Sequence, residues 1–483
     1  MVDIKFAKMN KLKLKRLIYR IQHDYLTLNN VVIAAAILIA MSWAWGSIES
    51  MQKNYELQRS IDDKRQQVEI EKLQDPKIFH IHLAQHIGQI SKETVKVGDF
   101  VKRYEKIGEM QGNISSPVHS PVSGQVIDIK EMILPNKKMA KTIVIKNDFK
   151  NEEIEKEKRE ISELENYKKE KIIEIIKNSG IVGEGGAQFP TYVKYDIKNK
   201  KVKTFIINGA ECEPYLTSDY SVIKSFANEL IKGIKIVKYL INPKNIVIGI
   251  EKENLELKQI LKKAILEEKM KIKIKILPTS YPQGSELQLI ASVTGKKIKK
   301  GELPINKGVV VSNVSTVKSV YDAFFKGAPL VERIVTVSGE NLEKIGNYLI
   351  KIGTPLEHII KILEPNENSK IIFGGPMMGQ EIFDKSTATI KGTSGILFLK
   401  NEGEIERNNC ISCGYCVEVC PMNLMPFEFA EFYEKKEYKM MAKTNIMNCI
   451  ECGACEYACP SRVPLIESIK NGKENLMKME VNK

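Results

Sequence analysis

Eight of the nine cysteines lie in one short stretch near the C-terminus, and they repeat a single spacing. The first four read C-x2-C-x2-C-x3-C-P, and the last four repeat this pattern without change. In this pattern three thiolates from one tight loop bind three irons of a cubane, and the fourth cysteine begins a helix directed toward the other cluster. The spacing therefore predicts two [4Fe–4S] clusters. Their expected ligands are Cys410, Cys413, Cys416 and Cys459 for the first cluster, and Cys449, Cys452, Cys455 and Cys420 for the second.

Structural zinc is the alternative for these cysteines. Zinc sites usually take paired C-x2-C knuckles, whereas each motif here is a triplet followed by a fourth cysteine that precedes proline. Gly414 and Gly453 permit the tight turn of each loop, whose backbone N–H groups can bond to cluster sulfurs. The ninth cysteine, Cys212, stands alone and is expected to be a buried, inert thiol. Because the cysteines are not spread as disulfide partners would be, they indicate metal binding in a reducing compartment.

A glycine-rich stretch, Gly183-Glu-Gly-Gly-Ala-Gln-Phe-Pro190, is the second candidate for chemistry. Such a loop can bring backbone N–H groups against a phosphate. It follows a predicted helix rather than a strand and lacks the third glycine of the dinucleotide fingerprint. Nearby, Glu211 and Glu213 follow the end of a predicted strand, where ligands of α/β sheets gather. An ordinary loop and two structural carboxylates are the alternatives for this region.

The elements that would position these residues alternate along the chain. Strands separated by helical stretches predict an α/β layer with a largely parallel sheet. A β–β–α unit is expected afterwards at 330–363. The predicted strands cover 203–208, 245–250 and 271–277, and the predicted helices cover 221–240 and 254–268.

Residues 78–146 are rich in short alternating strands punctuated by glycine and proline, which predicts a small barrel or sandwich. The stretch resembles biotinyl and lipoyl domains, whose modified lysine sits at a hairpin apex. The corresponding stretch, Glu109–Asn113, contains no lysine. We therefore expect an unmodified scaffold.

The N-terminus combines a basic stretch, Lys5–Arg20, with an apolar stretch at 28–48. About 20 residues at ~1.5 Å each span a hydrocarbon core of ~30 Å. Trp43 and Trp45 lie at its end, where an aromatic belt would sit. The pattern predicts one membrane helix followed by a charged helical stem, and a buried helix or an uncleaved signal sequence is the alternative.

Charge supports a membrane rather than a nucleic-acid partner. The chain carries 74 Lys and Arg against 60 Asp and Glu, for a net charge of +14. Residues 1–20 alone hold seven Lys or Arg and one Asp, whereas the other basic residues are interleaved with acidic ones. We therefore expect no nucleic-acid binding. With 483 residues, of which 43% are apolar, the chain can form several domains with cores of their own.

In combination these motifs resemble the RnfC family, the NADH-side subunits of Rnf ferredoxin:NAD oxidoreductases. The resemblance runs from about residue 78 to residue 469. More distantly, the glycine-rich loop is similar to that of the NADH-binding flavoprotein subunit of respiratory complex I, where the loop and the acidic strand end hold FMN and NADH. The stretches that carry the resemblance are Gly183–Thr191, Asn208–Tyr215, Tyr281–Glu286, Arg333–Gly339, Gly374–Gly379 and the two cysteine motifs.

The resemblance implies FMN and NAD(H) as cofactors besides the two clusters, and no catalytic residue beyond the cofactors. It implies electron transfer between NAD(H), FMN and the clusters, with flow from ferredoxin to NAD⁺ coupled to ion export. The implied partners are ferredoxin or an iron–sulfur subunit, the other subunits of an Rnf-type complex, and the membrane. The residues implied to contact FMN or NAD(H) are Gly183, Gly185, Gly186, Phe189, Lys194, Asn208, Glu211, Glu213 and Tyr215.

The resemblance also implies a location at the inner (cytoplasmic) membrane, with the cofactor domains on the cytoplasmic side. The positive-inside rule would instead put Lys5–Arg20 in the cytoplasm and the remainder outside. Residues 1–75 can therefore span the membrane, lie on it or come from an unrelated fusion. A soluble NADH-dependent reductase, such as a cobalamin reductase, and a non-catalytic membrane scaffold with clusters are the alternative functions. The coupling ion and the choice between NADH and NADPH stay open.

The expected fold is multidomain α/β. A polar tail is expected from Lys470. The expected parts are a basic segment, membrane helix (28–48) and stem at 1–75; a barrel-sandwich at 78–146; an FMN- and NADH-binding α/β domain at 170–325; a β-grasp module similar to soluble-ligand-binding domains at 330–365; a Gly-rich connection at 366–400; and a ferredoxin-like domain with two clusters at 405–470.

Overall fold

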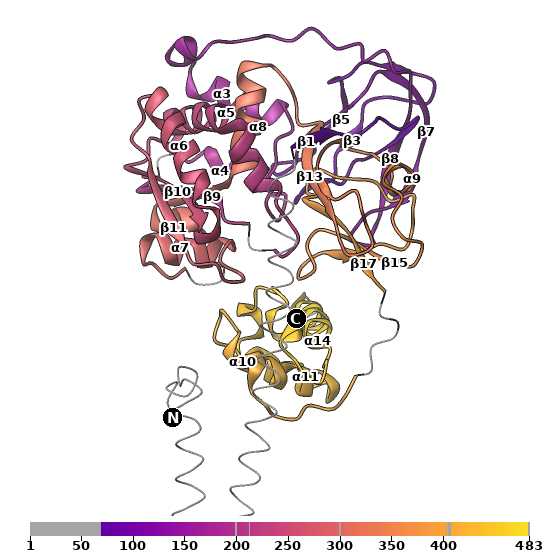
Figure 1. Cartoon of the computed structure of the whole chain (residues 1–483), viewed down its shortest axis with the longest axis vertical. Helices are drawn as coiled ribbons and strands as arrows, with labels where there is room; N and C mark the ends of the chain where they lie inside the picture. The colour runs from indigo at the N-terminus through magenta and orange to yellow at the C-terminus, as the bar shows by residue number, and fades with distance from the viewer. Residues whose placement is uncertain are drawn as a thin grey trace, which may run out of the picture. The chain divides into compact units, whose positions relative to one another are not determined.

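The computed structural model describes residues 69–198, 200–211, 213–298, 301–401, 403 and 407–481, which belong to the compact unit Lys64–Lys483. The expected membrane helix at 28–48, nearly all of the stem, and Cys212 lie outside the described residues. Within the described part of the chain, no helix combines the length and apolarity needed to cross a membrane. Figure 1 shows the succession of modules along the chain.

The first module consists of two antiparallel sheets that enclose an apolar core. Their strand orders are β2-β8-β7-β4 and β3-β5-β6. Buried Phe79 and Ile81 of β2 meet Ile143 and Ile145 of β8 in this core. Alternating strands punctuated by glycine and proline thus form a barrel-sandwich, as predicted. The strands are β2 (Ile78–His82), β3 (Lys92–Glu93), β4 (Phe100–Val101), β5 (Lys106–Glu109), β6 (Val118–His119), β7 (Gly124–Ile133) and β8 (Met139–Asn147).

A parallel four-stranded sheet forms the second module, in the order β11-β10-β9-β12. The predicted alternation of strands and helices is confirmed, with boundaries shifted by up to three residues. The strands are β9 (Thr204–Gly209), β10 (Asn245–Glu251), β11 (Lys273–Leu277) and β12 (Val309–Asn313). The helices are α3 (Lys169–Asn178), α4 (Thr191–Tyr195), α5 (Ser218–Ile241), α6 (Glu256–Glu267), α7 (Glu286–Thr294) and α8 (Val314–Phe325).

Helices cover both faces of this sheet (Figure 1). Along β9, Phe205 and Ile207 pack into a core shared with α5, α6 and α8. Ile206, between them, packs instead with Leu289 and Ile290 of α7. Because successive strand residues point to opposite faces, an uninterrupted apolar run is the expected sequence of a strand covered on both sides.

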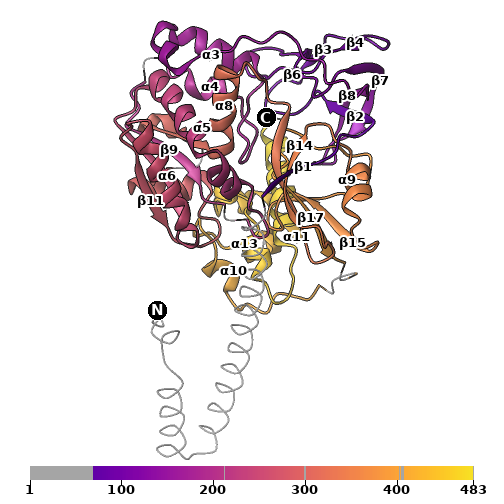
Figure 2. The ribbon, with the colours of Figure 1, turned by 45° about the horizontal axis from the view of Figure 1, so that its top comes forward.

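A mixed six-stranded sheet, in the order β1-β14-β13-β17-β15-β16, forms the third module. The predicted β–β–α unit is present as β13 (Glu332–Ser338), β14 (Gly346–Lys351) and α9 (Leu356–Leu363). Residues 366–400, expected as a Gly-rich connection, instead supply three strands of the same sheet. They are β15 (Ser369–Phe373), β16 (Gln380–Glu381) and β17 (Gly395–Lys400), and β1 (Ile70–Lys72) adds an edge. Figure 2 shows β1, β14, β15 and β17 with α9 beside them.

The cysteine region is helical and has two small apolar cores. Gly414 and Gly453 both take left-handed φ, of 80° and 83°, which the tight turn of each motif needs and glycine adopts without a Cβ clash. The polar tail expected from Lys470 is wrong, because α14 runs on to Val481. The helices are α10 (Tyr415–Glu418), α11 (Pro426–Glu434), α12 (Tyr438–Lys443), α13 (Ala454–Tyr457) and α14 (Leu465–Val481).

Candidate functional site

The parallel sheet has one position where the direction of chain winding reverses. The chain visits β9, β10 and β11 toward one side and then returns to place β12 on the other side of β9. Asn208 and Asn313 are register partners at the carboxyl ends of β9 and β12. In open α/β sheets a ligand binds outside the carboxyl ends of the strands at such a switch point.

The glycine-rich loop lies against this switch point. A Cβ added to Gly185 would come within 2.6 Å of the Asn313 side-chain nitrogen, so the loop backbone contacts the end of β12 directly. A Cβ added to Gly186 would meet no atom within 4 Å. The loop therefore packs on the sheet at Gly185 and leaves open space at Gly186, which is a cradle that a phosphate or a flavin ring fits.

Lys194 and Asn208 are fixed at the same edge of the sheet. The Lys194 ammonium donates to the Val311 carbonyl at 2.9 Å and pairs with Glu286 at 3.4 Å. The Asn208 amide donates to the Gly284 carbonyl at 2.8 Å. The segment before α7 thus joins the ends of β9 and β12 in one cluster.

Glu211 is bound to the protein's own donors. Its carboxylate accepts hydrogen bonds from the Ser218 hydroxyl at 2.7 Å and from the Asp219 amide at 2.8 Å. These donors belong to the first turn of α5, so Glu211 satisfies N–H groups that the helix leaves unpaired. Burial and the neighbouring Asp219 carboxyl raise the pKa of Glu211.

Glu213 holds a second loop. Its carboxylate accepts from the backbone amides of Met377 at 3.1 Å and Met378 at 2.9 Å. A Cβ on Gly375 would lie 2.2 Å from the Glu213 carboxylate, so glycine is needed for this approach. Burial raises the pKa of Glu213 to about 7, against the opposing effect of the two N–H groups.

The two aromatic residues expected at the site differ in their surroundings. Phe189 is half-buried, and its carbonyl accepts the Gly183 amide at 2.9 Å, which closes the glycine-rich loop. Tyr215 is buried, has a φ of 69°, and donates its hydroxyl to Glu340 beyond β13. The Tyr215 hydroxyl therefore links the strand-end segment to the third module.

Two buried cations support the glycine-rich loop. The Arg333 guanidinium donates to the carbonyls of Glu184 at 3.3 Å and Lys391 at 2.5 Å. The Lys391 ammonium donates to the carbonyls of Pro117 at 2.8 Å and Gly180 at 2.7 Å. Burial lowers the pKa of Lys391 to about 7. These bonds join the loop to the barrel-sandwich and to the third module.

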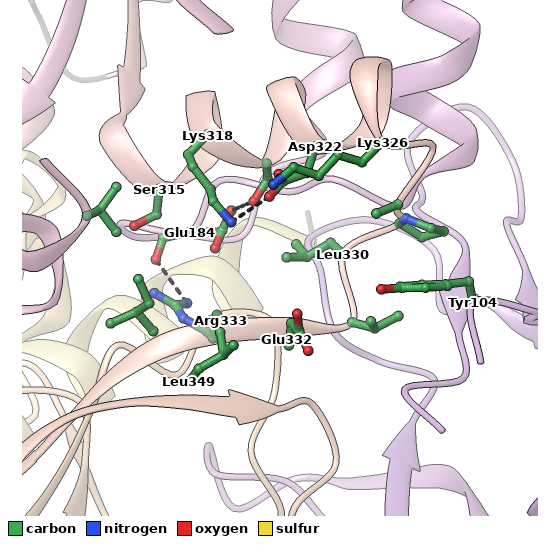
Figure 3. A pocket seen from close by; sticks show the side chains of 16 residues that line it. Tyr104, Glu184, Ser315, Lys318, Asp322, Lys326, Leu330, Glu332, Arg333 and Leu349 are labelled. Carbon is green, nitrogen blue, oxygen red and sulfur yellow. Dashed lines mark hydrogen bonds and ion pairs between the residues drawn. The ribbon is translucent and has the colours of Figure 1, made fainter. Parts of the chain in front are cut away.

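A cavity of about 130 Å³ is lined by Glu184 together with residues of α8 and β13 (Figure 3). The Glu184 carboxylate accepts from the Ser319 hydroxyl at 2.6 Å. Lys318 and Lys326 both pair with Asp322, at 2.6 and 2.7 Å. None of the residues expected to contact FMN or NAD(H) lines this cavity, so we do not assign it to either.

Glu184 and Asn313 were not among the predicted site residues. Glu184 is buried although it lies in a glycine-rich loop, and its amide donates to the Thr316 hydroxyl at 3.0 Å. Asn313 caps α8 by accepting the Ser315 amide. The sequence signal for Asn313 was its place at the end of an apolar run typical of a strand. Only tertiary contacts identify Glu184.

The cysteines fall into two neighbourhoods. Burial raises the pKa of the Cys416 thiol, and the neighbouring Cys413, Cys459 and Cys410 raise it further. Burial likewise raises the pKa of Cys455, followed by the effects of Cys449, Cys452 and Cys420. The structure thus brings the cysteines together in the two expected sets.

Both sets suit a cofactor larger than one ion. Among the described residues, no three His, Cys, Asp or Glu side chains gather closely enough to hold a single metal. In a cubane each thiolate binds a different iron, so its four sulfurs need not converge on one point. Backbone amides also reach sulfur, since Leu424 donates to Cys420 and Glu451 to Cys449, each at 3.3 Å. Such N–H donors suit negatively charged cluster ligands.

Three family models match separate parts of the chain. Residues 60–150 match the RnfC barrel sandwich hybrid domain. Residues 176–322 match the Nuo51 FMN-binding domain, and residues 409–463 match a 4Fe-4S dicluster domain. The matched segments include the glycine-rich loop and all eight clustered cysteines.

Curated relatives, all RnfC subunits, match most of the chain. It is 38% identical over 407 residues to the RnfC subunit of the Na⁺-translocating ferredoxin:NAD⁺ oxidoreductase complex of Acetobacterium woodii, covering 83% of this chain and 91% of the relative. It is 37% identical to the RnfC subunit of the proton-translocating complex of Clostridium ljungdahlii, covering 77% and 81%. It is 35% identical to the RnfC subunit of the ion-translocating oxidoreductase complex of Haemophilus influenzae, covering 83% and 62%.

Proposed function

Because the chain belongs to the RnfC family of subunits of ion-translocating ferredoxin:NAD⁺ oxidoreductase complexes, we propose that it is the electron-transfer subunit of such a complex. Electrons pass between NAD(H), FMN and two [4Fe–4S] clusters, with flow from ferredoxin to NAD⁺ coupled to ion export by membrane partners. Bound FMN would supply the exchange between two-electron chemistry with NAD(H) and one-electron chemistry with the clusters. The protein's own residues bind and orient the cofactors.

One observation carries the flavin assignment, which is the position of the glycine-rich loop at the switch point of the sheet. Gly185 contacts Asn313 beside Asn208, while Gly186 faces open space. We assign the FMN and NAD(H) contacts to this edge. The contact residues are Gly183, Gly185, Gly186, Phe189, Lys194, Asn208, Glu211, Glu213 and Tyr215.

The two carboxylates act mainly by shaping this edge. Glu211 fixes the start of α5, and Glu213 holds Met377 and Met378 in place. The Lys194 ammonium, already fixed on Val311, would add a positive charge near a bound phosphate. The backbone N–H groups of the loop would add hydrogen bonds to the same group.

The first cluster is assigned to Cys410, Cys413, Cys416 and Cys459, and the second to Cys449, Cys452, Cys455 and Cys420. The two thiol neighbourhoods described above support this division. Two contacts favour the second cluster as the one nearer the flavin. The Tyr281 hydroxyl donates to the Cys452 carbonyl, and a Cβ on Gly453 would lie 2.7 Å from the Met377 carbonyl.

The proposed domains are a barrel-sandwich at 78–146, an FMN- and NADH-binding domain at 170–325 and a ferredoxin-like domain at 405–470. Between the last two we propose a β-grasp module. It is supported by the strand order β14-β13-β17-β15, in which the central pair β13 and β17 is parallel. This order extends the module to residue 400 instead of 365.

We further propose that the protein works at the inner membrane with its cofactors on the cytoplasmic side, since NAD(H) is cytoplasmic. Residues 1–75 would contribute to this association. Flotation with vesicles of inner-membrane lipid should recover the full chain and release a chain that begins at Glu69. Equal flotation of both chains would exclude a role for the N-terminal segment.

The assignment is tested by FMN binding to the full chain and to Gly186→Val. Because Gly186 faces open space, the valine should leave the flavin-free fold intact and block the cradle, weakening FMN binding at least about tenfold, or ~1.4 kcal/mol. Ser162→Val, which adds similar bulk to an exposed residue outside the site, serves as the control. Unchanged FMN affinity in Gly186→Val, with unchanged thermal unfolding, would contradict the site.

A further inference from the structure

The two cysteine motifs are repeats in backbone as well as in sequence. An offset of 39 residues, the separation of Cys410 from Cys449, relates the two halves. Left-handed residues recur at the same offset, with φ of 56° and 57° at Ser412 and Glu451. A further pair, Asn423 and Arg462, takes φ of 53° and 52°. Because the halves match this closely, a difference between their side chains is informative.

Lys473 on α14 is such a difference. It is only 5% exposed, although lysine is rarely buried. Its ammonium donates to the Cys449 carbonyl at 2.7 Å and pairs with Glu451, inside the second motif. At the same offset in the first half stands Glu434, an exposed carboxylate at the end of α11.

A buried ammonium beside a cluster loop has a definite electrostatic effect. Reduction adds negative charge to the cluster, and a nearby positive charge stabilises the reduced form more than the oxidised one. The side chain of Lys473 is 6% exposed, whereas that of its counter-ion Glu451 is 34% exposed. Water therefore screens the carboxylate more than the ammonium, and the pair should keep a net positive effect.

We propose that Lys473 raises the reduction potential of the second cluster, so that two clusters with the same ligand pattern differ in how readily they accept an electron. This inference rests on the proposed function only in requiring both clusters. It assigns Lys473 a tuning role through the protein charge near Cys449, without contact between the ammonium and any reacting group.

The test is a potentiometric titration of the cluster-replete full chain, followed by EPR. Lys473→Met keeps the apolar stem and removes the charge. It should lower one of the two midpoint potentials by about tenfold in the reduction equilibrium constant, or ~59 mV for one electron, and leave the other unchanged. Glu451→Gln should move the same potential upward, and Lys473→Arg should retain the wild-type value.

The symmetry-related variant Glu434→Gln is the control and should move neither potential. The proposal is overturned if Lys473→Met and Glu451→Gln leave both potentials unchanged, or shift them in the same direction, while iron content stays at the wild-type level. If Lys473→Met loses a cluster, Glu451→Gln still tests the sign. Wild-type protein that holds no pair of clusters would refute the proposed function itself.

Discussion

Glu213 is a single residue whose surroundings make a pH-dependent prediction. Its folded-state pKa is raised to about 7 from an ordinary value of 4.5, with burial as the main cause. Between these values the folded state binds more protons than the unfolded state, so the stability from Glu213 is complete below about 4.5 and is lost as the pH rises through 7. Glu213→Gln should remove this dependence.

The measurement is urea unfolding of flavin-free wild type and Glu213→Gln at the two ends of this pH range. The difference in unfolding free energy, wild type minus variant, should be smaller at the higher pH by about 1–3 kcal/mol. Subtracting the variant cancels the other titrating groups. A difference that stays constant or grows with pH would contradict the assignment of a buried, proton-retaining carboxyl.

At the residue scale, the sequence identified what spacing and glycine content reveal. The eight clustered cysteines, Gly185 and Asn208 were predicted from local motifs and from the resemblance those motifs carry. Lys473 and Glu184 were missed because a lysine in a polar segment and a glutamate in a loop are ordinarily exposed. Their burial comes from tertiary contacts with other elements, which no local pattern encodes.

The crossing of α5 and α8 gives a prediction at the scale of elements. A Cβ on Gly233 of α5 would lie 2.3 Å from the Val317 carbonyl of α8, and backbone cannot move aside cheaply. Gly233→Ala should therefore destabilise the α/β module by about 1–3 kcal/mol, although alanine favours a helix. Asn228→Ala, at an exposed position on the same helix, should be neutral or slightly stabilising.

Thermal unfolding of both variants followed by circular dichroism provides the comparison. A rise in melting temperature for Gly233→Ala would show that the two helices are not so closely packed. The contrast between the two substitutions matters more than either shift alone, because both introduce the same residue into one helix.

Long elements with strong apolar patterns were predictable, whereas short ones were not. The strands β9, β10 and β11 and the helices α5 and α6 carry apolar runs or periodic faces, and their predicted ranges agree with the structure within three residues. Residues 366–400 were expected as a connection because glycines interrupt them. Their strands β15 and β17 are fixed by pairing with each other and with β13, which is information outside the segment.

At the scale of the whole chain, the matched glycines of the two cysteine motifs allow a controlled test of the electron path. A Cβ on Gly453 would lie 2.7 Å from the Met377 carbonyl, whereas a Cβ on Gly414 would meet nothing within 4 Å. Both residues have left-handed φ, so alanine strains both backbones alike. Gly453→Ala should slow the arrival of NADH electrons on the clusters more than Gly414→Ala.

Rapid mixing with NADH separates this effect from flavin reduction. The rate of flavin bleaching should be the same in both variants, since neither glycine lies at the flavin site. If Gly414→Ala slows cluster reduction as much as Gly453→Ala does, the contact with Met377 is not part of the path.

Anaerobic addition of NADH to the FMN-reconstituted, cluster-replete chain tests the central claim most directly. Flavin absorbance is followed first, and the reduced-cluster EPR signal afterwards, with a stronger reductant added if NADH does not populate it. We predict bleaching of the bound flavin and electrons on two [4Fe–4S] clusters. A chain that binds no flavin, or whose bound flavin does not respond to NADH, would contradict the proposed electron path and leave only the ferredoxin-like domain in place.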